Sequence, residues 1–326
     1  MVRIFDYFLG AIPNMSIGNQ RPHSSVQTDL TIIISASPSP THPSIELIQT
    51  VLESTKKHLS PAIKRVVFCL DAPKASLPVL ETQRYEDFID NLRSAYVANE
   101  SCRFSIQSEW GHLSGGLKKA IPLIETRFVL VIQHDLPFIE RIELEPLMEI
   151  LESYSEVKRI EFTRDSGPCL WDIDPRYRRK RYKSSNFHVG GKHIPLTKTL
   201  AWTDNNYLCS KSYLEKIVFG VIKNERIFPE HAMNLASSRL TSNLFGNWRF
   251  GSENSGPYIL HTDGKGIQDA KLVNSSVYKV FLINRQRLKV AVERFKFRKR
   301  GVGLIFRESW TKRQTTKIKN LDKHVR

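Results

Sequence analysis

Residues 128 to 135 read F-V-L-V-I-Q-H-D, five apolar residues followed at once by three polar ones. An apolar run of this length is typical of a buried strand, and the polar residues mark its end. Similar strand-like segments lie at 30–35, 65–70, 103–107 and 157–163. Segments with apolar residues at helical spacing alternate with them, at 43–59, 81–98, 113–125 and 142–153. Strands that alternate with helices predict an α/β fold, in which a mostly parallel sheet is flanked by helices on both faces.

The alternation stops after the strand at 157–163, and residues 164–206 show neither a helical nor a strand period. We expect an irregular segment there, and a long irregular segment in a compact domain is usually functional or mobile. Three further helices are predicted, at 210–219, 229–238 and 279–294, the last of them basic and amphipathic. The predicted organisation is a lead-in over 1–29, a single α/β domain over 30–275 and a basic C-terminal extension over 276–326.

The composition is that of a folded protein, with 40% hydrophobic and 25% charged residues in a chain of 326. No apolar stretch approaches the roughly 18 residues of a membrane-spanning helix, and the N-terminal residues lack the apolar segment of a secretory signal. The four cysteines stand far apart without a paired metal-ligand spacing, so we expect reduced thiols. A cytoplasmic location is the expectation from these features.

The formal net charge of +16 is unevenly distributed along the chain. Much of the excess lies at 176–183 and beyond Arg285, where basic residues crowd together. A solvated basic tail is the plainer interpretation of this pattern. The functional alternative is attraction to an anionic membrane surface, a lipid phosphate or an acidic glycan.

Polar side chains follow the predicted strands at the points where the strands end. Ser35 ends the first strand, Asp71 follows the second, and Gln133, His134 and Asp135 come at the end of the fourth. The carboxyl ends of parallel strands share one edge of a sheet, and α/β proteins bind ligands in the crevice beyond that edge. We therefore expect these five residues to line a binding site.

The two carboxylates in this set have specific candidate roles. Asp71 suits hydrogen bonds to the base or ribose of a nucleotide, or alternatively starts a turn before Pro73. Asp135 suits a hard divalent cation that bridges diphosphate oxygens, or alternatively starts a turn of its own. Gln133 and His134 add polarity that a simple turn does not need, which favours a functional Asp135.

Four stretches together resemble the nucleotide-binding half of glycosyltransferase family 2-like enzymes with the GT-A fold: T-I-I-I-S-A-S, V-V-F-C-L-D, G-H-L-S-G-G-L-K-K-A and F-V-L-V-I-Q-H-D. The resemblance implies a nucleotide-sugar-binding half over 30–140 and an acceptor half over 141–275. It also implies a nucleoside diphosphate-sugar donor, a divalent metal (manganese or magnesium), and transfer with inversion. The family normally ends its fourth strand in Asp-x-Asp, whereas Gln133-His134-Asp135 matches only the second acidic position.

Two later segments extend the resemblance to the acceptor half. Residues 201–206 read A-W-T-D-N-N and resemble an acceptor-side motif, and residues 228–231 read F-P-E-H and resemble the acidic motif that supplies the base. A base is needed because an acceptor hydroxyl is a poor nucleophile until its proton is taken. Glu230 and Asp204 are the two candidates, with Glu230 slightly ahead. Alternatively, Glu230 favours the first turn of a helix and Asp204 forms an Asx-turn.

Residues 256–264 read G-P-Y-I-L-H-T-D-G, a short apolar strand that ends in His-x-Asp-Gly. The family often brings a late histidine back to the metal, which makes His261 the second metal-ligand candidate beside Asp135. Imidazole and carboxylate together suit manganese, although a lone histidine at a strand end is ordinarily structural. Asp263 either supports His261 or is a turn residue before Gly264.

The sequence thus predicts a metal-assisted glycosyltransferase that acts on a hydroxyl of a glycan or lipid-linked acceptor. The basic loop at 176–183 either supplies cations to the leaving diphosphate or is a solvated loop, and the basic C-terminus is either a solvated tail or a contact with anionic membrane. One alternative is a nucleotidyltransferase of similar fold, which usually carries a glycine-rich basic loop where this chain has S-A-S-P-S-P-T-H-P. The other is a non-catalytic basic nucleic-acid-binding protein, but no recognisable nucleic-acid module is present, so no nucleic-acid partner is expected.

Overall fold

The structure is a computed structural model, and it describes residues 30–60, 65–164, 184–199, 202–222, 229–239, 245–252 and 255–262. The predictions for 1–29, 176–183, Asp263 and 276–326 lie outside the described residues. No helix in the described ranges is both long and apolar enough to cross a membrane.

The described chain forms a sheet with the strand order β4-β3-β1-β5-β10-β7-β11-β9-β8. Four strands of the first half pair in parallel, as predicted: β1 (Leu30–Ala36), β3 (Arg65–Leu70), β4 (Cys102–Ile106) and β5 (Phe128–Gln133). The second half is mixed and consists of β7 (Arg159–Glu161), β8 (Ser184–Val189), β9 (Lys192–Lys198), β10 (Tyr207–Ser210) and β11 (Asn247–Phe250). Strand β10 runs antiparallel to both β5 and β7 and joins the two halves.

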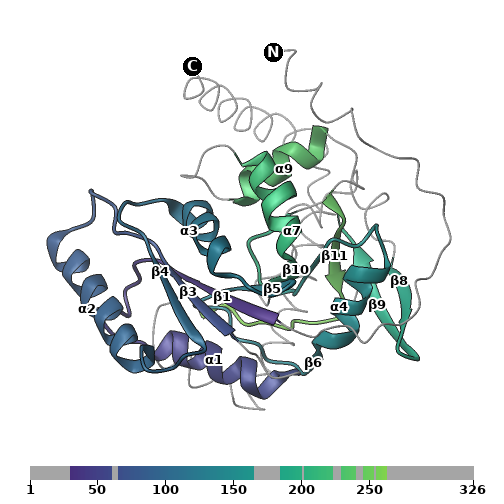
Figure 1. Cartoon of the computed structure of the whole chain (residues 1–326), viewed down its shortest axis with the longest axis horizontal. Helices are drawn as coiled ribbons and strands as arrows, with labels where there is room; N and C mark the ends of the chain where they lie inside the picture. Colours follow the sequence, from purple (N-terminus) through teal and green to yellow (C-terminus); the bar gives the residue numbers. More distant parts are fainter. Residues whose placement is uncertain are drawn as a thin grey trace, which may run out of the picture.

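Helices cover both faces of the sheet, which confirms the predicted α/β fold (Figure 1). One face packs against α1 (Glu46–His58), α2 (Val79–Tyr96) and α4 (Leu144–Ser153). The other face packs against α3 (His112–Ala120), η1 (Ile121–Leu123), α7 (Lys211–Tyr213), the π-helical turn η2 (Leu214–Val218), α8 (Phe219–Val221) and α9 (Pro229–Arg239). A small separate sheet pairs β2 (Leu59–Ser60) with β6 (Ile142–Glu143).

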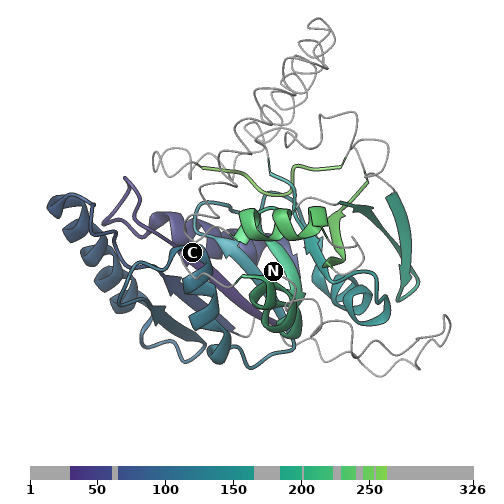
Figure 2. The same cartoon turned by 90° about the horizontal axis from the view of Figure 1, so that it is seen from above.

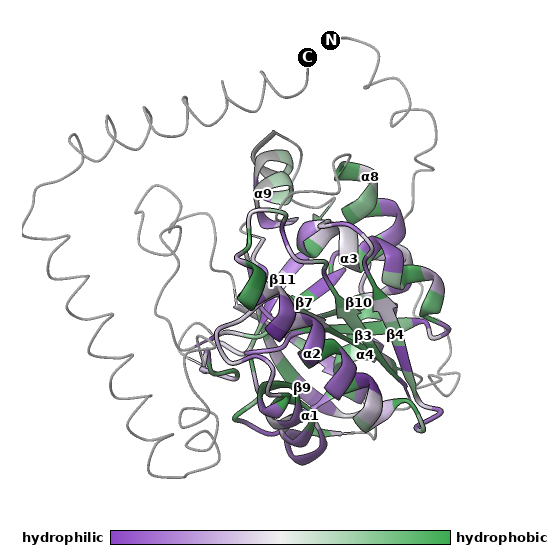
Figure 3. Ribbon diagram, turned by 90° about the vertical axis from the view of Figure 1, so that its left-hand side faces the viewer, coloured by the Kyte–Doolittle hydropathy of each residue, from purple (hydrophilic) through white to green (hydrophobic). Residues whose placement is uncertain are grey.

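Strand β1 shows why both faces need cover. Ile32 and Ile34 belong to the core cluster on the α1 side, Ile33 belongs to the cluster on the α3 side, and all three are fully buried. Burying an isoleucine side chain stabilises the fold by about 1.5–3 kcal/mol, so the continuous apolar run favours a central strand. Figure 3 shows the strands around β3 and β10 in green, as hydrophobic, and much of α2 in purple, as hydrophilic.

The prediction of an irregular segment over 164–206 was wrong for residues 184–198. Strands β8 and β9 form an antiparallel hairpin, and Gly190 and Gly191 make its turn with φ values of +52° and +74°. Glycine adopts positive φ at no steric cost, and a Gly-Gly pair between two strands is a hairpin signal. The apolar pattern is weak because the hairpin lies at the sheet edge, where Phe187 and Val189 are buried but their neighbours are exposed.

The start of helix α1 also differs from the prediction, which began this helix at residue 43. Helix α1 begins at Glu46, and Pro43 lies in the turn that precedes it rather than in the first helical turn.

Viewed from above, the first half of the described chain lies beside the second half, purple and blue against teal and green (Figure 2). Because β1, β3 and β5 pair in parallel, their carboxyl ends meet at one edge of the sheet. The segment that leads into β10 lies beside this edge, where Asn206 contacts Gln133.

Candidate active site

A pocket of about 340 Å³ opens beyond the carboxyl ends of β1, β3 and β5. Four residues that the sequence predicts for nucleotide binding line it, namely Ser35, Asp71, Gln133 and His134. The rest of the lining comes from the last residues of β1 and β3, the loops that follow them, and the approach to and first half of α3: Ala36, Ser37, Pro38, Cys69, Lys74, Leu77, Trp110, His112, Leu113 and Gly116. A pocket of this size suits a small organic ligand.

Asp71 fastens the end of β3 to the start of α3. Its Oδ1 accepts hydrogen bonds from the backbone N–H groups of Ala72 (2.9 Å) and Gly111 (2.8 Å). Burial raises the pKa of Asp71, and these backbone hydrogen bonds together with the nearby His112 oppose that rise. Gly111 lies so close to α3 that an added Cβ would stand 3.2 Å from the Cα of Gly115. The absence of a side chain at position 111 thus lets its N–H reach the Asp71 carboxylate while the chain packs closely against α3.

Sequence reasoning missed an aromatic and basic wall of the same pocket. The Nζ of Lys74 lies 4.7 Å from the centroid of the Trp110 ring, and the Trp110 and His112 rings are 5.1 Å apart. His112 adopts a positive φ of 61°, which is uncommon for a residue other than glycine and turns the chain sharply at the start of α3. The signal was present, because Trp110-Gly111-His112 follows the polar residues at the end of the third predicted strand.

The structure brings together Asp135 and His261, the two predicted metal ligands. His261 Nε2 lies 3.3 Å from Asp135 Oδ2. Residues 135–139 and 258–262 run side by side, and the backbone N–H of Thr262 donates to the carbonyl of Asp135 at 3.0 Å. Burial raises the pKa of Asp135, but the hydrogen bond from His261 and the charges of His134 and His261 outweigh burial and lower it overall.

The donor set at Asp135 fits a divalent cation in part. Its Oδ1 is buried and has no hydrogen-bond partner, so this oxygen has an unused lone pair. Carboxylate oxygen and imidazole nitrogen both bind manganese. Within the described ranges, however, no group of three or more His, Cys, Asp or Glu residues could hold a metal ion. A bound cation would therefore need further ligands from the substrate and from water.

The two candidate bases, Asp204 and Glu230, are neighbours at the N-terminus of α9. The backbone N–H of Glu230 donates to Asp204 Oδ1 at 3.2 Å, so the Asp204 carboxylate caps this helix. Burial raises the pKa of Asp204 to about 7, with a further rise from the charge of Glu230, while Arg159 and Arg164 oppose it. A carboxyl group with this pKa changes charge near neutral pH.

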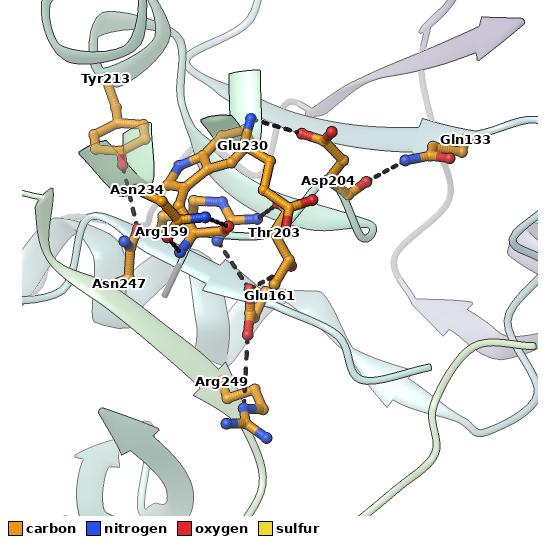
Figure 4. A network of polar contacts seen from close by, with 11 residues as sticks. Gln133, Arg159, Glu161, Thr203, Asp204, Tyr213, Glu230, Asn234, Asn247 and Arg249 are labelled. Atoms are coloured by element: carbon orange, nitrogen blue, oxygen red, sulfur yellow. Dashed lines mark hydrogen bonds and ion pairs between the residues drawn. The ribbon is translucent and has the colours of Figure 1, made fainter. Parts of the chain in front are cut away.

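Gln133 connects the pocket to this carboxylate pair (Figure 4). Its side-chain Nε2 donates to the backbone carbonyl of Asp204, and its backbone N–H donates to Asn206 Oδ1 at 3.1 Å. Gln133 also lines the pocket. The strand end at β5 is therefore in contact with the segment that carries Asp204.

Trp202 and Tyr207 are core residues rather than exposed platforms for a sugar ring. Each is 1% exposed, and both rings pack against the guanidinium of Arg159, at 4.4 Å and 4.3 Å from the ring centroids. Their burial excludes direct stacking on a substrate sugar in this structure.

No protein-family model matches the chain, and no curated protein matches it. Among solved structures, the chain is similar to the crystal structure of S. aureus TarS, with a TM-score of 0.44 and 12% sequence identity. The match covers 72% of this chain and 36% of that chain, so this chain spans little more than a third of TarS. Similarity at this level carries neither residue roles nor an activity across to this chain.

Proposed function

We propose that this protein is a glycosyltransferase that moves a sugar from a nucleoside diphosphate-sugar to an acceptor hydroxyl. The observation that carries the proposal is the position of Gln133 between two features. On one side lies a pocket of about 340 Å³ at the carboxyl ends of parallel strands, lined by Asp71 and Trp110. On the other side lies Asp204, a carboxyl group whose pKa is about 7. A nucleotide site beside a base is what this reaction requires.

The nucleoside of the donor is assigned to the pocket. Asp71 accepts hydrogen bonds from the base or ribose, since its carboxylate is held in place by Ala72 and Gly111 at the pocket wall. Trp110 offers an aromatic face for a base, and stacking on such a face is worth about 1–3 kcal/mol. Lys74 adds a cation beside this ring, suited to attract an anionic ligand.

The diphosphate is assigned to the strand end at 133–135. Asp135 and His261 would hold manganese or magnesium there, and the bound cation would act as a Lewis acid on the leaving diphosphate. A cation on these residues requires neutral His261, because a protonated imidazole has no free lone pair. The His261 and Asp135 pair is thus expected to favour the metal as pH rises.

The acceptor proton is assigned to Asp204. As the acceptor oxygen forms its bond to the anomeric carbon, the bond from that carbon to the diphosphate breaks, and the hydroxyl proton passes to the Asp204 carboxylate. Burial and the charge of the neighbouring Glu230 raise the pKa of Asp204, which makes Asp204 the better-matched base at neutral pH. Direct attack of this kind inverts the anomeric configuration. The acceptor itself is proposed to be a glycan or a lipid-linked molecule.

The test is calorimetric titration with a panel of nucleoside diphosphates and their sugars, with and without manganese. We compare the wild type with Asp71→Asn and Asp135→Ala, and use Asp90→Asn on the exposed face of α2 as the matched control. Binding of one nucleotide that is weakened by both site variants but not by the control supports the proposal. Absence of binding to any nucleotide, with salt-sensitive binding to DNA or RNA instead, would replace it with the nucleic-acid-binding alternative.

A further inference from the structure

Arg159 is a fully buried arginine in β7, a strand in the middle of the sheet. Its Nη1 pairs with Glu161 at 3.0 Å, and its Nη2 donates to the backbone carbonyl of Thr203 at 2.6 Å. The desolvation cost of a buried ion pair often exceeds its attraction, so such a pair is weak evidence of a contribution to stability alone. The contacts of Arg159 with Glu161 and Thr203 therefore need an explanation other than stability.

Thr203 is held at both its backbone and its side chain. Arg159 donates to its carbonyl, and its own hydroxyl donates to Glu161 Oε2 at 2.8 Å. Arg249, from β11, faces the other oxygen of Glu161, with its Nε 3.6 Å from Oε1. Figure 4 shows this chain of contacts, which runs from Arg249 through Glu161 to Thr203. The residue directly before Asp204 is thereby fixed to β7 at two points, and Arg249 of β11 supports Glu161.

The residues on either side of Thr203 are fixed as well. Trp202 exchanges two hydrogen bonds of 2.8 Å with the side-chain amide of Asn234 in α9. Asn206 donates to the carbonyl of Leu136 at 2.7 Å. The segment 202–206 is therefore held by α9, by β7 through Arg159 and Glu161, and by the residues at the end of β5.

We propose that Arg159 is a positioning residue for Asp204: acting through Thr203 and together with Glu161, it holds the Asp204 carboxylate against the N-terminus of α9 in the geometry that takes the acceptor proton. This inference rests on the proposed function, because it assigns Arg159 a part in the same reaction. Arg159 does not touch substrate in this scheme.

The charges around Asp204 make the proposal measurable. Burial raises the pKa of Asp204 and the charge of Glu230, from α9, adds to the rise, whereas Arg159, from β7, and Arg164, which follows β7, lower it. Tyr207, from β10, also faces Asp204, whose charge adds to the rise in the pKa of Tyr207. Loss of the Arg159 charge is therefore expected to raise the pKa of Asp204 above about 7.

The experiment compares Arg159→Met with Arg127→Met, a matched control at an arginine that is 62% exposed. The Asp204 carboxyl is titrated by carbon-13 NMR without any donor, and kcat is measured against pH with the cognate donor. In Arg159→Met we expect the pKa of Asp204 to rise by about one unit and the acidic limb of kcat to move with it, a tenfold loss of rate on that limb. The KM for the donor should change by less than about twofold, since the pocket is not altered.

Two further variants separate charge from geometry. Arg159→Lys keeps the charge but not the planar fork, so we expect little change in the pKa of Asp204 and a lower kcat at every pH. The double variant Arg159→Met/Glu161→Gln removes both charges of the buried pair, which keeps the fold free of an uncompensated carboxylate and should reproduce the shift.

The NMR titration needs no donor, so it can be interpreted whether or not the protein transfers a sugar. If Arg159→Met and the double variant titrate and turn over like Arg127→Met, the positioning role is refuted. If no variant and no wild-type protein transfers sugar, the proposed function fails, and the NMR titration still reports whether Arg159 controls Asp204.

Discussion

The Asp71→Asn variant tests separately how the buried charge of Asp71 affects the stability of the fold and how it contributes to nucleotide binding. Burial raises the pKa of Asp71 in the folded protein, so the ionised carboxylate is less favourable there than in the unfolded chain. For a carboxyl group whose folded pKa is raised, the contribution to stability is greatest at low pH and falls as pH rises through the ordinary and then the raised pKa. At pH 7 the amide, which carries no charge, is therefore expected to leave the free energy of unfolding unchanged or to increase it.

Binding of the donor should respond in the opposite direction. A hydrogen bond to a charged group contributes about 1.5–3 kcal/mol, so replacing the carboxylate acceptor should weaken nucleotide binding by roughly 10- to 150-fold. Asp71→Ala should lose binding too, but should also destabilise the fold. It leaves the N–H groups of Ala72 and Gly111 without their acceptor, at about 1–3 kcal/mol for each buried group.

Urea unfolding at pH 7 and calorimetric titration with the cognate nucleotide measure the two effects on the same samples. Equal destabilisation of Asp71→Asn and Asp71→Ala would refute the reasoning about buried charge. Wild-type nucleotide affinity in Asp71→Asn would refute the role assigned to the carboxylate.

Asp204→Asn should lower kcat by about 10²- to 10⁴-fold. Wild-type kcat should rise with pH through about 7, because the ionised Asp204 carboxylate is the active form. A pH–rate profile of both proteins from pH 5.5 to 9 checks these two expectations. A flat wild-type profile would contradict the assignment. Asp135→Ala and His261→Ala should each abolish manganese-dependent enhancement of nucleotide binding, measured by titration with and without the metal; enhancement that survives both would place the cation elsewhere. Ile33→Ala should lower the free energy of unfolding, measured in urea, by about 2–5 kcal/mol, since Ile33 is fully buried in the core between the sheet and α3. The same variant should leave nucleotide affinity unchanged.

The strand-end residues were predictable because one local pattern determines them. Ser35, Asp71 and Gln133 each follow an apolar run, and a parallel sheet brings such ends to the same edge whatever the remainder of the fold. The structure places all three, with His134, around one pocket. Their roles in binding stay predictions, as do those of Asp135 and His261, although the structure brings this pair together.

The contacts of Asp204 and Arg159 could not be derived from the sequence. They depend on β10 pairing with both β5 and β7, and this long-range order has no signature in local periodicity. A charged residue in a strand is ordinarily exposed, so nothing marked Arg159 as buried. The hairpin at 184–198 was missed for a different reason, because its Gly190-Gly191 turn is a recognised signal that the weak apolar pattern of its strands obscured.

The place of β10 in the sheet also bears on how the chain folds. The strands β1, β3, β4 and β5 occur early in the sequence, and apart from the pairing of β5 with β10 they pair only with one another. This parallel half can therefore assemble from residues 30–133. Strand β7 follows soon after in the sequence but does not pair with β5, and it must wait for β10 and β11. Contacts of high sequence separation form slowly because loop closure costs entropy first. The edge of β5 is thus expected to stay unpaired during synthesis until Tyr207–Ser210 has emerged, and the segment that carries Asp204 is set in place by the same event that joins the two halves.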